Sequence, residues 1–231
     1  MVDHLLSAEP FAACMMAVSK GLRRRREARM GMKKLFVIGG MGAGKSTARK
    51  VLVGEGLPFI DLDQIGHDVL LQENVKSDLV EAFGEDILGD DGQVVRSRLA
   101  AKAFSSPAET RKLNRITMPR IEENFTDRLD ELEREGNKAV VVEYSVFKSR
   151  QTSMANGADV VIAVLASLDK RIARAVAAGW DEADVRRRIA RQISDADRIE
   201  QADVVFNNDG SPEDLAKEVL DWWRSYEKTI D

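Results

Sequence analysis

The chain has 231 residues, enough for one α/β domain with insertions, and its 44% hydrophobic content allows a sizeable buried core. Its 35 basic and 39 acidic residues give a formal charge of −4, which excludes the basic balance typical of general nucleic-acid or anionic-membrane binding. A single cysteine, Cys14, excludes a disulfide framework or a thiolate zinc site within one chain, and it favours a reducing cytoplasm.

The first 31 residues are expected to lie outside the fold. Residues 11–18 are apolar, but the arginines follow them, whereas a secretory signal begins with its basic residues. A weak amphipathic anchor or interaction arm is one interpretation. A flexible extension, with the true start at Met30 or Met32, is the interpretation that we favour. No apolar run reaches the roughly 20 residues that a membrane helix needs.

From residue 33 onwards, short apolar runs alternate with longer amphipathic stretches. Apolar runs bounded by turn signals predict strands over residues 35–38, 58–60, 139–143, 158–165 and 202–206. Because these runs are apolar on both faces, they indicate a parallel sheet covered by helices. Polar residues at the carboxyl ends of such strands gather along one edge, where ligands bind.

Helices are predicted between these strands. We expect them over residues 46–54, 64–136, 181–192 and 212–226. The long helix-rich stretch contains a turn signal at residues 90–92, and Pro119 is predicted to begin a fresh helix within it. Ser211 is the expected N-cap of the closing helix.

Residues 39–46 (GGMGAGKS) fit the phosphate-loop pattern G-x-x-x-x-G-K-[ST] between a strand and a helix. Glycines let the backbone N–H groups approach phosphate oxygens, and the following helix adds its positive end. Lys45 is expected to reach the β- and γ-phosphates, and the Ser46 hydroxyl to bind Mg²⁺. The alternative is a glycine-rich turn without a ligand. The candidate nucleotide-binding residues in the loop are Gly40, Gly42, Ala43, Gly44, Lys45, Ser46 and Thr47.

Asp61 and Asp63 follow the second predicted strand, opposite the loop. Because alternate residues of an extended segment share a face, one carboxylate would accept the proton of an acceptor hydroxyl while the other orients Mg²⁺ through water. A capping or turn pair remains equally open. His67 has no partner histidine or cysteine nearby, and both a satisfied helix residue and an acceptor contact remain open for it.

The predicted helix over residues 181–192 is rich in arginine. Phosphoryl transfer uses mobile cations over the transferring group, and one or two of these arginines would close over ATP. The alternative is a solvated basic face balanced by neighbouring carboxylates. The arginines concerned are Arg186, Arg187, Arg188 and Arg191.

Taken in order, these segments resemble the dephospho-CoA kinase family. The resemblance covers about residues 33–224 and is more specific than the loop alone. Its matching segments are residues 39–47, the P-x-x-D-x-D of 58–63, 84–88, 91–92, Arg96, Leu99, Phe104, 113–114, Pro119, the Arg188-Ile189 pair with Gln192, and 202–205 with Asn208, Gly210 and Leu215.

This resemblance implies ATP-dependent phosphorylation of the ribose 3′-hydroxyl of dephospho-CoA, with Mg²⁺ as cofactor. It implies an α/β, three-layer P-loop kinase fold with a five-stranded parallel sheet, a helical acceptor-binding insertion and a small helical lid. The expected divisions of the kinase domain, residues 32–231, are a core over 32–66 and 137–231, an insertion over 67–136, and a lid over 171–196. The expected partners are ATP and dephospho-CoA, without nucleic acid or membrane, and no oligomeric state is predicted.

The resemblance also assigns roles to residues. Lys45, Asp63 as the proposed base, and Arg188 are the candidate catalytic residues. Asp61 would support Asp63, and His67 completes the acceptor-binding set. Asn208 would bind the nucleotide on its adenine side. Glu143 would serve Mg²⁺ through water.

Three departures from the family pattern leave other functions open. The family's His-Pro is Met118-Pro119 here, and its Asp-x-Pro-Leu-Leu is residues 143–147 (EYSVF), which lacks the apolar Pro-Leu-Leu wall. The family's lid arginine falls near Ala177 and Ala178, so Arg174, Arg187 or Arg188 would have to replace it. The alternatives are another small-metabolite or nucleotide P-loop kinase, and a catalytically weakened nucleotide-binding regulatory protein.

Overall fold

The computed structural model describes residues 31–230. Cys14 and the expectations for residues 1–30 lie outside the described residues. Within residues 31–230, no helix is both long enough and apolar enough to cross a membrane.

One five-stranded sheet organises the chain, and all its strands are parallel. The strand order is β2-β3-β1-β4-β5, so the first strand lies at the centre. This confirms the predicted five-stranded parallel sheet. The bounds of the strands are Lys33–Ile38 (β1), Phe59–Asp61 (β2), Ala139–Glu143 (β3), Val160–Leu165 (β4) and Val204–Asn207 (β5).

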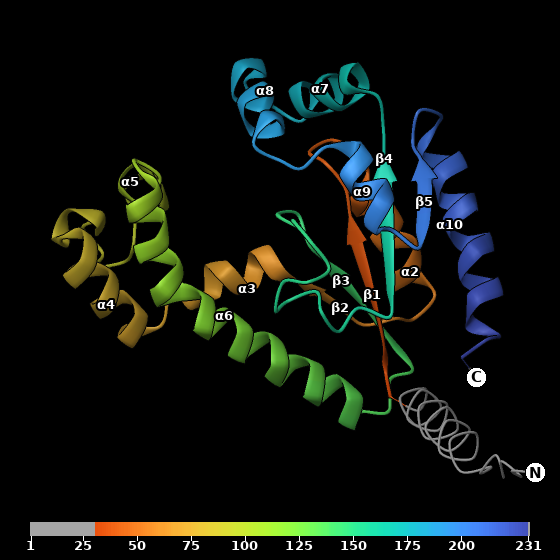
Figure 1. Cartoon of the computed structure of the whole chain (residues 1–231), viewed down its shortest axis with the longest axis horizontal. Helices are drawn as coiled ribbons and strands as arrows, with labels where there is room; N and C mark the ends of the chain where they lie inside the picture. The colour runs from red at the N-terminus through yellow and green to blue at the C-terminus, as the bar shows by residue number, and fades with distance from the viewer. Residues whose placement is uncertain (1–30, 231) are drawn as a thin grey trace, which may run out of the picture.

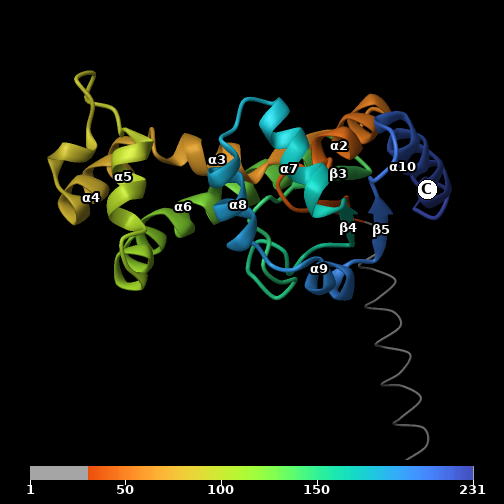
Figure 2. The ribbon, with the colours of Figure 1, turned by 90° about the horizontal axis from the view of Figure 1, so that it is seen from above.

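Side chains of β1 alternate between the two faces of this sheet because successive residues of a strand point to opposite sides. Leu35 and Val37 pack with α2 (Lys45–Gly54) and α10 (Pro212–Glu227). Phe36 and Ile38 pack with α6 (Pro107–Arg134) on the other face. The result is a helix–sheet–helix sandwich, and Figure 2 shows α2 and α10 on one side of the strands and α9 (Asp195–Gln201) on the other. The three-layer α/β prediction is therefore confirmed.

A second, smaller core lies away from the sheet. Val75, Leu79 and Phe83 of α4 pack there with Leu99 of α5, and Figure 1 shows these helices projecting to one side of the sheet. The helices of this region have the bounds Leu62–Val69 (α3), Glu73–Phe83 (α4), Glu85–Ile87 (the 3₁₀-helix η1) and Arg96–Ala103 (α5). The predicted turn over residues 90–92 lies between η1 and α5, where Gly92 donates to Gly89 O at 3.0 Å.

The helices α7 (Leu168–Ala177) and α8 (Glu182–Ala190) form a third unit. Ile172 and Ala175 of α7 pack against Val185 of α8. In Figure 1 the pair lies above the carboxyl ends of β1 and β4. The sequence predicted the second helix of this pair but not the first.

The prediction that Pro119 begins a new helix is wrong, because α6 runs continuously past it. The actual start lies twelve residues earlier, where Ser106 caps the helix by accepting from Glu109 N at 3.2 Å and Pro107 occupies the first turn. An interior proline costs about 3 kcal/mol. Packing on both sides of the proline offsets this cost, because Leu113 contacts the smaller core and Phe125 the sheet core.

Phe125 anchors α6 to the sheet, and substituting it should destabilise the fold. Its side chain is 6% exposed and meets Phe36 edge to face at 6.3 Å between ring centroids. We expect Phe125→Ala to lower the free energy of unfolding by about 3–5 kcal/mol, measured by urea denaturation.

Phe104→Ala is the matched control, because that ring is 59% exposed. Its expected change is within about 0.5 kcal/mol. Equal losses in the two variants would contradict the assignment of Phe125 to the core.

Candidate active site

The loop between β1 and α2 adopts the conformation that its glycines permit. Gly42 and Gly44 have φ angles of 73° and 109°, which residues with a Cβ rarely adopt. A Cβ on Gly44 would also collide with the amide of Asn208. The loop leads directly into α2, where Thr47 N donates to Gly44 O at 3.0 Å, while the N–H groups of Lys45 and Ser46 have no acceptor inside the helix and are available to an anion.

Lys45 lies inside this loop and is 9% exposed. Its Nζ donates to Gly39 O at 3.1 Å and to Gly40 O at 3.4 Å. Burial lowers the pKa of Lys45, while the nearby Glu143 and Asp63 carboxylates raise it. A buried ammonium held by neutral carbonyls is well prepared to receive an anionic ligand.

Asn208 fixes the far side of the loop. Its side-chain Nδ2 donates to Ala43 O at 2.8 Å. Arg174 Nη2 donates to Asn208 O at 2.9 Å, while Arg174 Nη1 is buried without a hydrogen-bond partner in the described residues. These groups border a pocket of about 360 Å³ beside Ser46 and Thr47. Arg174 therefore offers a free donor on this side of the loop.

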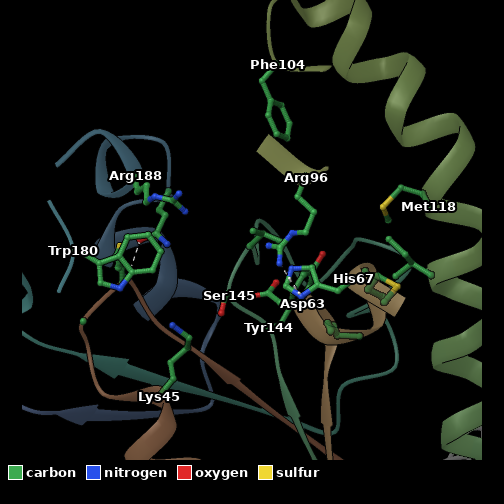
Figure 3. A pocket seen from close by; sticks show the side chains of 18 residues that line it. Lys45, Asp63, His67, Arg96, Phe104, Met118, Tyr144, Ser145, Trp180 and Arg188 are labelled. Atoms are coloured by element: carbon green, nitrogen blue, oxygen red, sulfur yellow. Dashed lines mark hydrogen bonds between the residues drawn. The ribbon is translucent and has the colours of Figure 1, made fainter. Parts of the chain in front are cut away.

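A larger cavity of about 840 Å³ opens on the other side of Lys45. Figure 3 shows Lys45 at its base, Asp63 and His67 on one wall, and Trp180 with Arg188 on the opposite wall. Phe104 overhangs it from the direction of α5. The cavity thus joins the phosphate loop, the smaller helical core and the α7–α8 unit.

Asp61 and Asp63 do not share the face of an extended segment, and that expectation is wrong. Asp61 ends β2 and caps α3, with its Oδ1 accepting from Asp63 N at 2.9 Å and from Gln64 N at 3.2 Å. Asp63 lies in the first turn of α3 and lines the large cavity. The capping alternative therefore describes Asp61, while the Asp63 carboxylate at the cavity has no hydrogen bond or ion pair within residues 31–230.

Glu143 lies at the end of β3, in register with Val37 of β1 and Asp61 of β2. Its Oε2 is 3.3 Å from Arg49 Nη1, yet it has no hydrogen-bond partner in the described residues. Burial raises the pKa of Glu143, and the cations of Lys45 and Arg49 oppose that shift. A buried carboxylate oxygen without a hydrogen-bond partner normally has a ligand or water to bind. Its position beside the loop suits a hydrated Mg²⁺.

The described residues contain no cluster of three or more His, Cys, Asp or Glu side chains suited to hold a metal by themselves. Mg²⁺ commonly takes one or two protein ligands and completes its shell with phosphate and water oxygens. The Ser46 hydroxyl at the start of α2 and the Glu143 carboxylate beside it supply such a set.

His67 lies in α3 and lines the large cavity. Its Nδ1 is 3.5 Å from Arg96 Nη1, so the pair places a histidine and a guanidinium on the wall next to Asp63. The histidine is therefore neither isolated nor packed into the core.

Arg188 reaches the cavity from α8, whereas its neighbours do not line it. Its guanidinium lies 4.7 Å from the centre of the Trp180 ring, and its Nε donates to Asp184 Oδ2 at 2.8 Å. Arg186 and Arg187 pair with carboxylates of their own helix, as the solvated-face alternative describes.

The departures from the family pattern also lie on this cavity. Met118 of α6 lines it, with Tyr144, Ser145 and Val146. The family's Pro-Leu-Leu wall is absent here, and Tyr144 and Val146 supply the apolar surface after β3 instead. Phe147 instead packs into the core against Tyr144.

Sequence patterns missed two residues near the loop. Trp180 was not singled out, although a tryptophan directly after a glycine in an arginine-rich segment is a usable signal. Arg171 was also missed, because nothing in the sequence distinguishes a buried arginine from a solvated one. It is 5% exposed, and its Nε donates to Met41 O at 3.0 Å.

Comparison with known proteins agrees with this geometry. The family model described as dephospho-CoA kinase matches residues 35–214. The chain belongs to the dephospho-CoA kinase family. A dephospho-CoA kinase of Corynebacterium efficiens is 42% identical over 186 residues, covering 80% of this chain and 92% of that protein.

Solved structures show the same fold. The crystal structure of TT1252 from Thermus thermophilus matches with a TM-score of 0.73 at 26% identity, over 84% of this chain and 98% of that one. A dephospho-CoA kinase from Campylobacter jejuni matches in fold with a TM-score of 0.59 at 20% identity, over 84% and 97% of the two chains.

Asn208→Ala should weaken nucleotide binding, because it leaves the buried Ala43 carbonyl without its donor. An unsatisfied buried group costs about 1–3 kcal/mol, so we expect about a 10-fold rise in the Kd for Mg-ADP, measured by calorimetric titration. Asn207→Ala is the matched control, because Asn207 is exposed and ends β5 directly before Asn208. Equal Kd values for Asn208→Ala and the wild type would remove Asn208 from the loop's support.

Proposed function

We propose that the chain transfers the γ-phosphoryl group of Mg-ATP to the ribose 3′-hydroxyl of dephospho-CoA. The observation that carries this proposal is that Lys45 and Asp63 border one cavity. A phosphate-binding cation and a free carboxylate then lie on either side of the space where donor and acceptor would meet. Membership in the dephospho-CoA kinase family supports the choice of acceptor.

The nucleotide occupies the loop in this proposal. Backbone N–H groups of the loop, among them those of Gly40, Gly42 and Gly44, and the ammonium of Lys45 receive the β- and γ-phosphates, which replace the loop carbonyls as partners of Nζ. The N–H group of Ala43 would first have to leave Gly40 O, to which it donates at 3.1 Å. Asn208 and Arg174 border the nucleotide's other side.

The acceptor occupies the large cavity, bordered by Asp63, His67 and Arg96. The ribose 3′-oxygen attacks the γ-phosphorus, and the bond from that phosphorus to the β–γ bridging oxygen breaks. The proton of the 3′-hydroxyl passes to the Asp63 carboxylate, and the products are ADP and coenzyme A. Asp61 acts indirectly, because its carboxylate holds the first turn of α3 that carries Asp63.

Ser46 and Glu143 would hold Mg²⁺, the hydroxyl directly and the carboxylate through water. When bound, the ion neutralises charge on the β- and γ-phosphate oxygens. Arg188 is the lid cation of this proposal, because it alone of the four arginines on residues 181–192 lines the cavity. To reach a phosphate it must leave Trp180 and Asp184.

We place this reaction in the cytoplasm, in keeping with a single cysteine and small-molecule substrates. The proposal is tested by incubating the protein with Mg-ATP and dephospho-CoA and following coenzyme A by mass spectrometry. Bound ATP without a phosphorylated acceptor would instead support a regulatory nucleotide-binding protein. Turnover of other acceptors alone would support a different small-metabolite kinase.

Asp63→Asn should abolish most turnover while leaving nucleotide binding intact. Loss of a general base lowers kcat by about 10²–10⁴-fold. Asp61→Asn is the matched control, because asparagine also caps helices well and should keep kcat within about 3-fold. Full activity in Asp63→Asn, or equal losses in both variants, would contradict the division of roles.

Lys45→Ala should also abolish turnover while the protein stays folded. Removing a preorganised electrostatic contact commonly lowers kcat by about 10²–10³-fold. Circular dichroism would check folding and calorimetry nucleotide affinity. Retention of wild-type rates would remove Lys45 from the proposed mechanism.

Glu143→Gln should raise the free Mg²⁺ concentration that gives half the maximal rate by about 10-fold, because a neutral amide holds a hydrated cation less well. Glu213→Gln, an exposed position in the first turn of α10, is the control. Chelation by EDTA should stop wild-type turnover. An unchanged Mg²⁺ requirement in Glu143→Gln would remove Glu143 from the metal site.

A further inference from the structure

Arg171 of α7 is a buried cation that the mechanism above does not use. Its side chain is 6% exposed, and burial lowers its pKa, although a guanidinium stays protonated. The guanidinium packs so closely on Gly40 that a Cβ there would collide with it. The carbonyl of Arg171 occupies the corresponding space beside Gly42. The first part of the phosphate loop therefore rests directly on this residue.

Arg171 and Gln192 together hold both backbone polar groups of Met41. The Arg171 Nε donates to Met41 O at 3.0 Å, and Met41 N donates to Gln192 Oε1 at 3.1 Å. The same Gln192 oxygen lies 3.4 Å from Arg171 Nη2, which closes the arrangement. A loop residue with both groups held by side chains has little freedom to rotate its peptides.

These two side chains come from the two ends of the α7–α8 unit. Arg171 lies in α7, and Gln192 follows the end of α8 at residue 190. The Met41 side chain itself packs into the small core of that unit with Ile172 and Val185. Met41 and Gln192 also line the large cavity. The loop and the lid helices are thus joined at one residue on the cavity wall.

Positive charge exceeds negative charge where the loop meets the α7–α8 unit. Arg171 Nη1 lies 3.5 Å from Asp195 Oδ2, while Arg198 Nη1 lies 2.6 Å from Asp195 Oδ1. Two buried guanidinium groups therefore share one carboxylate. Both cations also lower the pKa of Lys45, after the larger effect of burial. The surplus positive charge next to the loop favours a highly charged anion.

We propose that Arg171 is a positioning residue for phosphoryl transfer, which ties the α7–α8 lid to the phosphate loop through Met41. The predicted effect of Arg171 on turnover rests on the proposed function. The predicted effect of Arg171 on nucleotide binding does not depend on it. Phosphates that fix the loop also fix Met41, and through Arg171 and Gln192 they fix both ends of the lid. The lid carries Arg188, so nucleotide binding orders the cation that the transfer step uses.

Substitutions at Arg171 separate geometry from charge. Arg171→Lys keeps a positive charge but loses the planar fork that reaches Met41, Gln192 and Asp195 together. Arg171→Met keeps the aliphatic part of the side chain and loses both the positive charge and the planar fork. Gln192→Met removes the shared acceptor at similar length. Arg187→Met is the matched control, because Arg187 is exposed and pairs with Asp184 of its own helix.

Steady-state kinetics give the first test. We expect Arg171→Met to raise KM for ATP about 10-fold and lower kcat about 10-fold, and Arg171→Lys to lower kcat similarly with a smaller rise in KM. The double variant Arg171→Met/Gln192→Met should be no more than about 2-fold worse than Arg171→Met, since both side chains hold the backbone of one residue, Met41, and contact each other. Wild-type constants in folded Arg171→Lys and Arg171→Met, or additive effects, would overturn the proposal.

Trp180 fluorescence gives the second test, in which Mg-ADP is the probe. Trp180 lies on the lid and is 44% exposed. The part of the fluorescence change on nucleotide binding that disappears in Trp180→Phe is assigned to Trp180. We expect this change in the wild type and in Arg187→Met, and its loss in both Arg171 variants at saturating Mg-ADP. A wild-type protein without the change, or Arg171 variants that retain it, would overturn the coupling.

Folding and function are kept apart in this design. Thermal unfolding identifies a variant that fails to fold, and Arg171→Lys and Gln192→Met then carry the test. A structural role alone would lower the melting temperature without altering KM, kcat or the Trp180 response of the folded protein. If the wild type binds Mg-ADP but does not phosphorylate dephospho-CoA, the proposed function fails while the fluorescence test of the coupling still decides.

Discussion

A buried lysine enclosed by its own loop is the constraint around which the site is built. The Lys45 ammonium contacts the carbonyls of Gly39 and Gly40 rather than a hydrogen-bonded carboxylate. Burying such a charge is unfavourable, and an anion bound at the loop relieves that cost. The glycine conformations and the Asn208 bond to Ala43 shape the loop around this lysine, and Glu143 lies at the carboxyl end of the neighbouring strand β3. Two buried arginines next to the loop add to this cost, because Arg171 and Arg198 also lower the pKa of Lys45.

Much of the fold could be predicted from the sequence, because apolar runs buried on both faces leave few alternatives. Strand ends differed by one or two residues, as with Val160–Leu165 against the predicted 158–165. Pro119 misled the prediction, since a proline reads equally as a first-turn residue or as an interior break. The Ser106-Pro107 start was visible in the sequence, but the packing that carries α6 past Pro119 depends on contacts with two distant cores.

Some residues of the candidate site could likewise be predicted from the sequence, and others could not. Lys45 and Ser46 follow from a pattern whose chemistry is local, and both lie at the start of α2, directly after the loop. Asp61 and Asp63 could not be separated by sequence, because a cap and a cavity carboxylate look alike until the helix start is known. Arg171 could not be found at all, since its burial arises when α7 packs on the loop. Residues whose role depends on packing between distant segments are those that sequence reasoning misses.

A calorimetric titration of the purified protein with Mg-ATP, Mg-ADP and AMP tests the phosphate-gripping loop most directly. If backbone amides and Lys45 bind the β- and γ-phosphates as proposed, affinity should be high for ATP and ADP and weaker by at least about 100-fold for AMP, which lacks both phosphates. Equal affinity for AMP and ATP would mean that the loop does not read the terminal phosphates. No affinity for any magnesium nucleotide would contradict the nucleotide site itself.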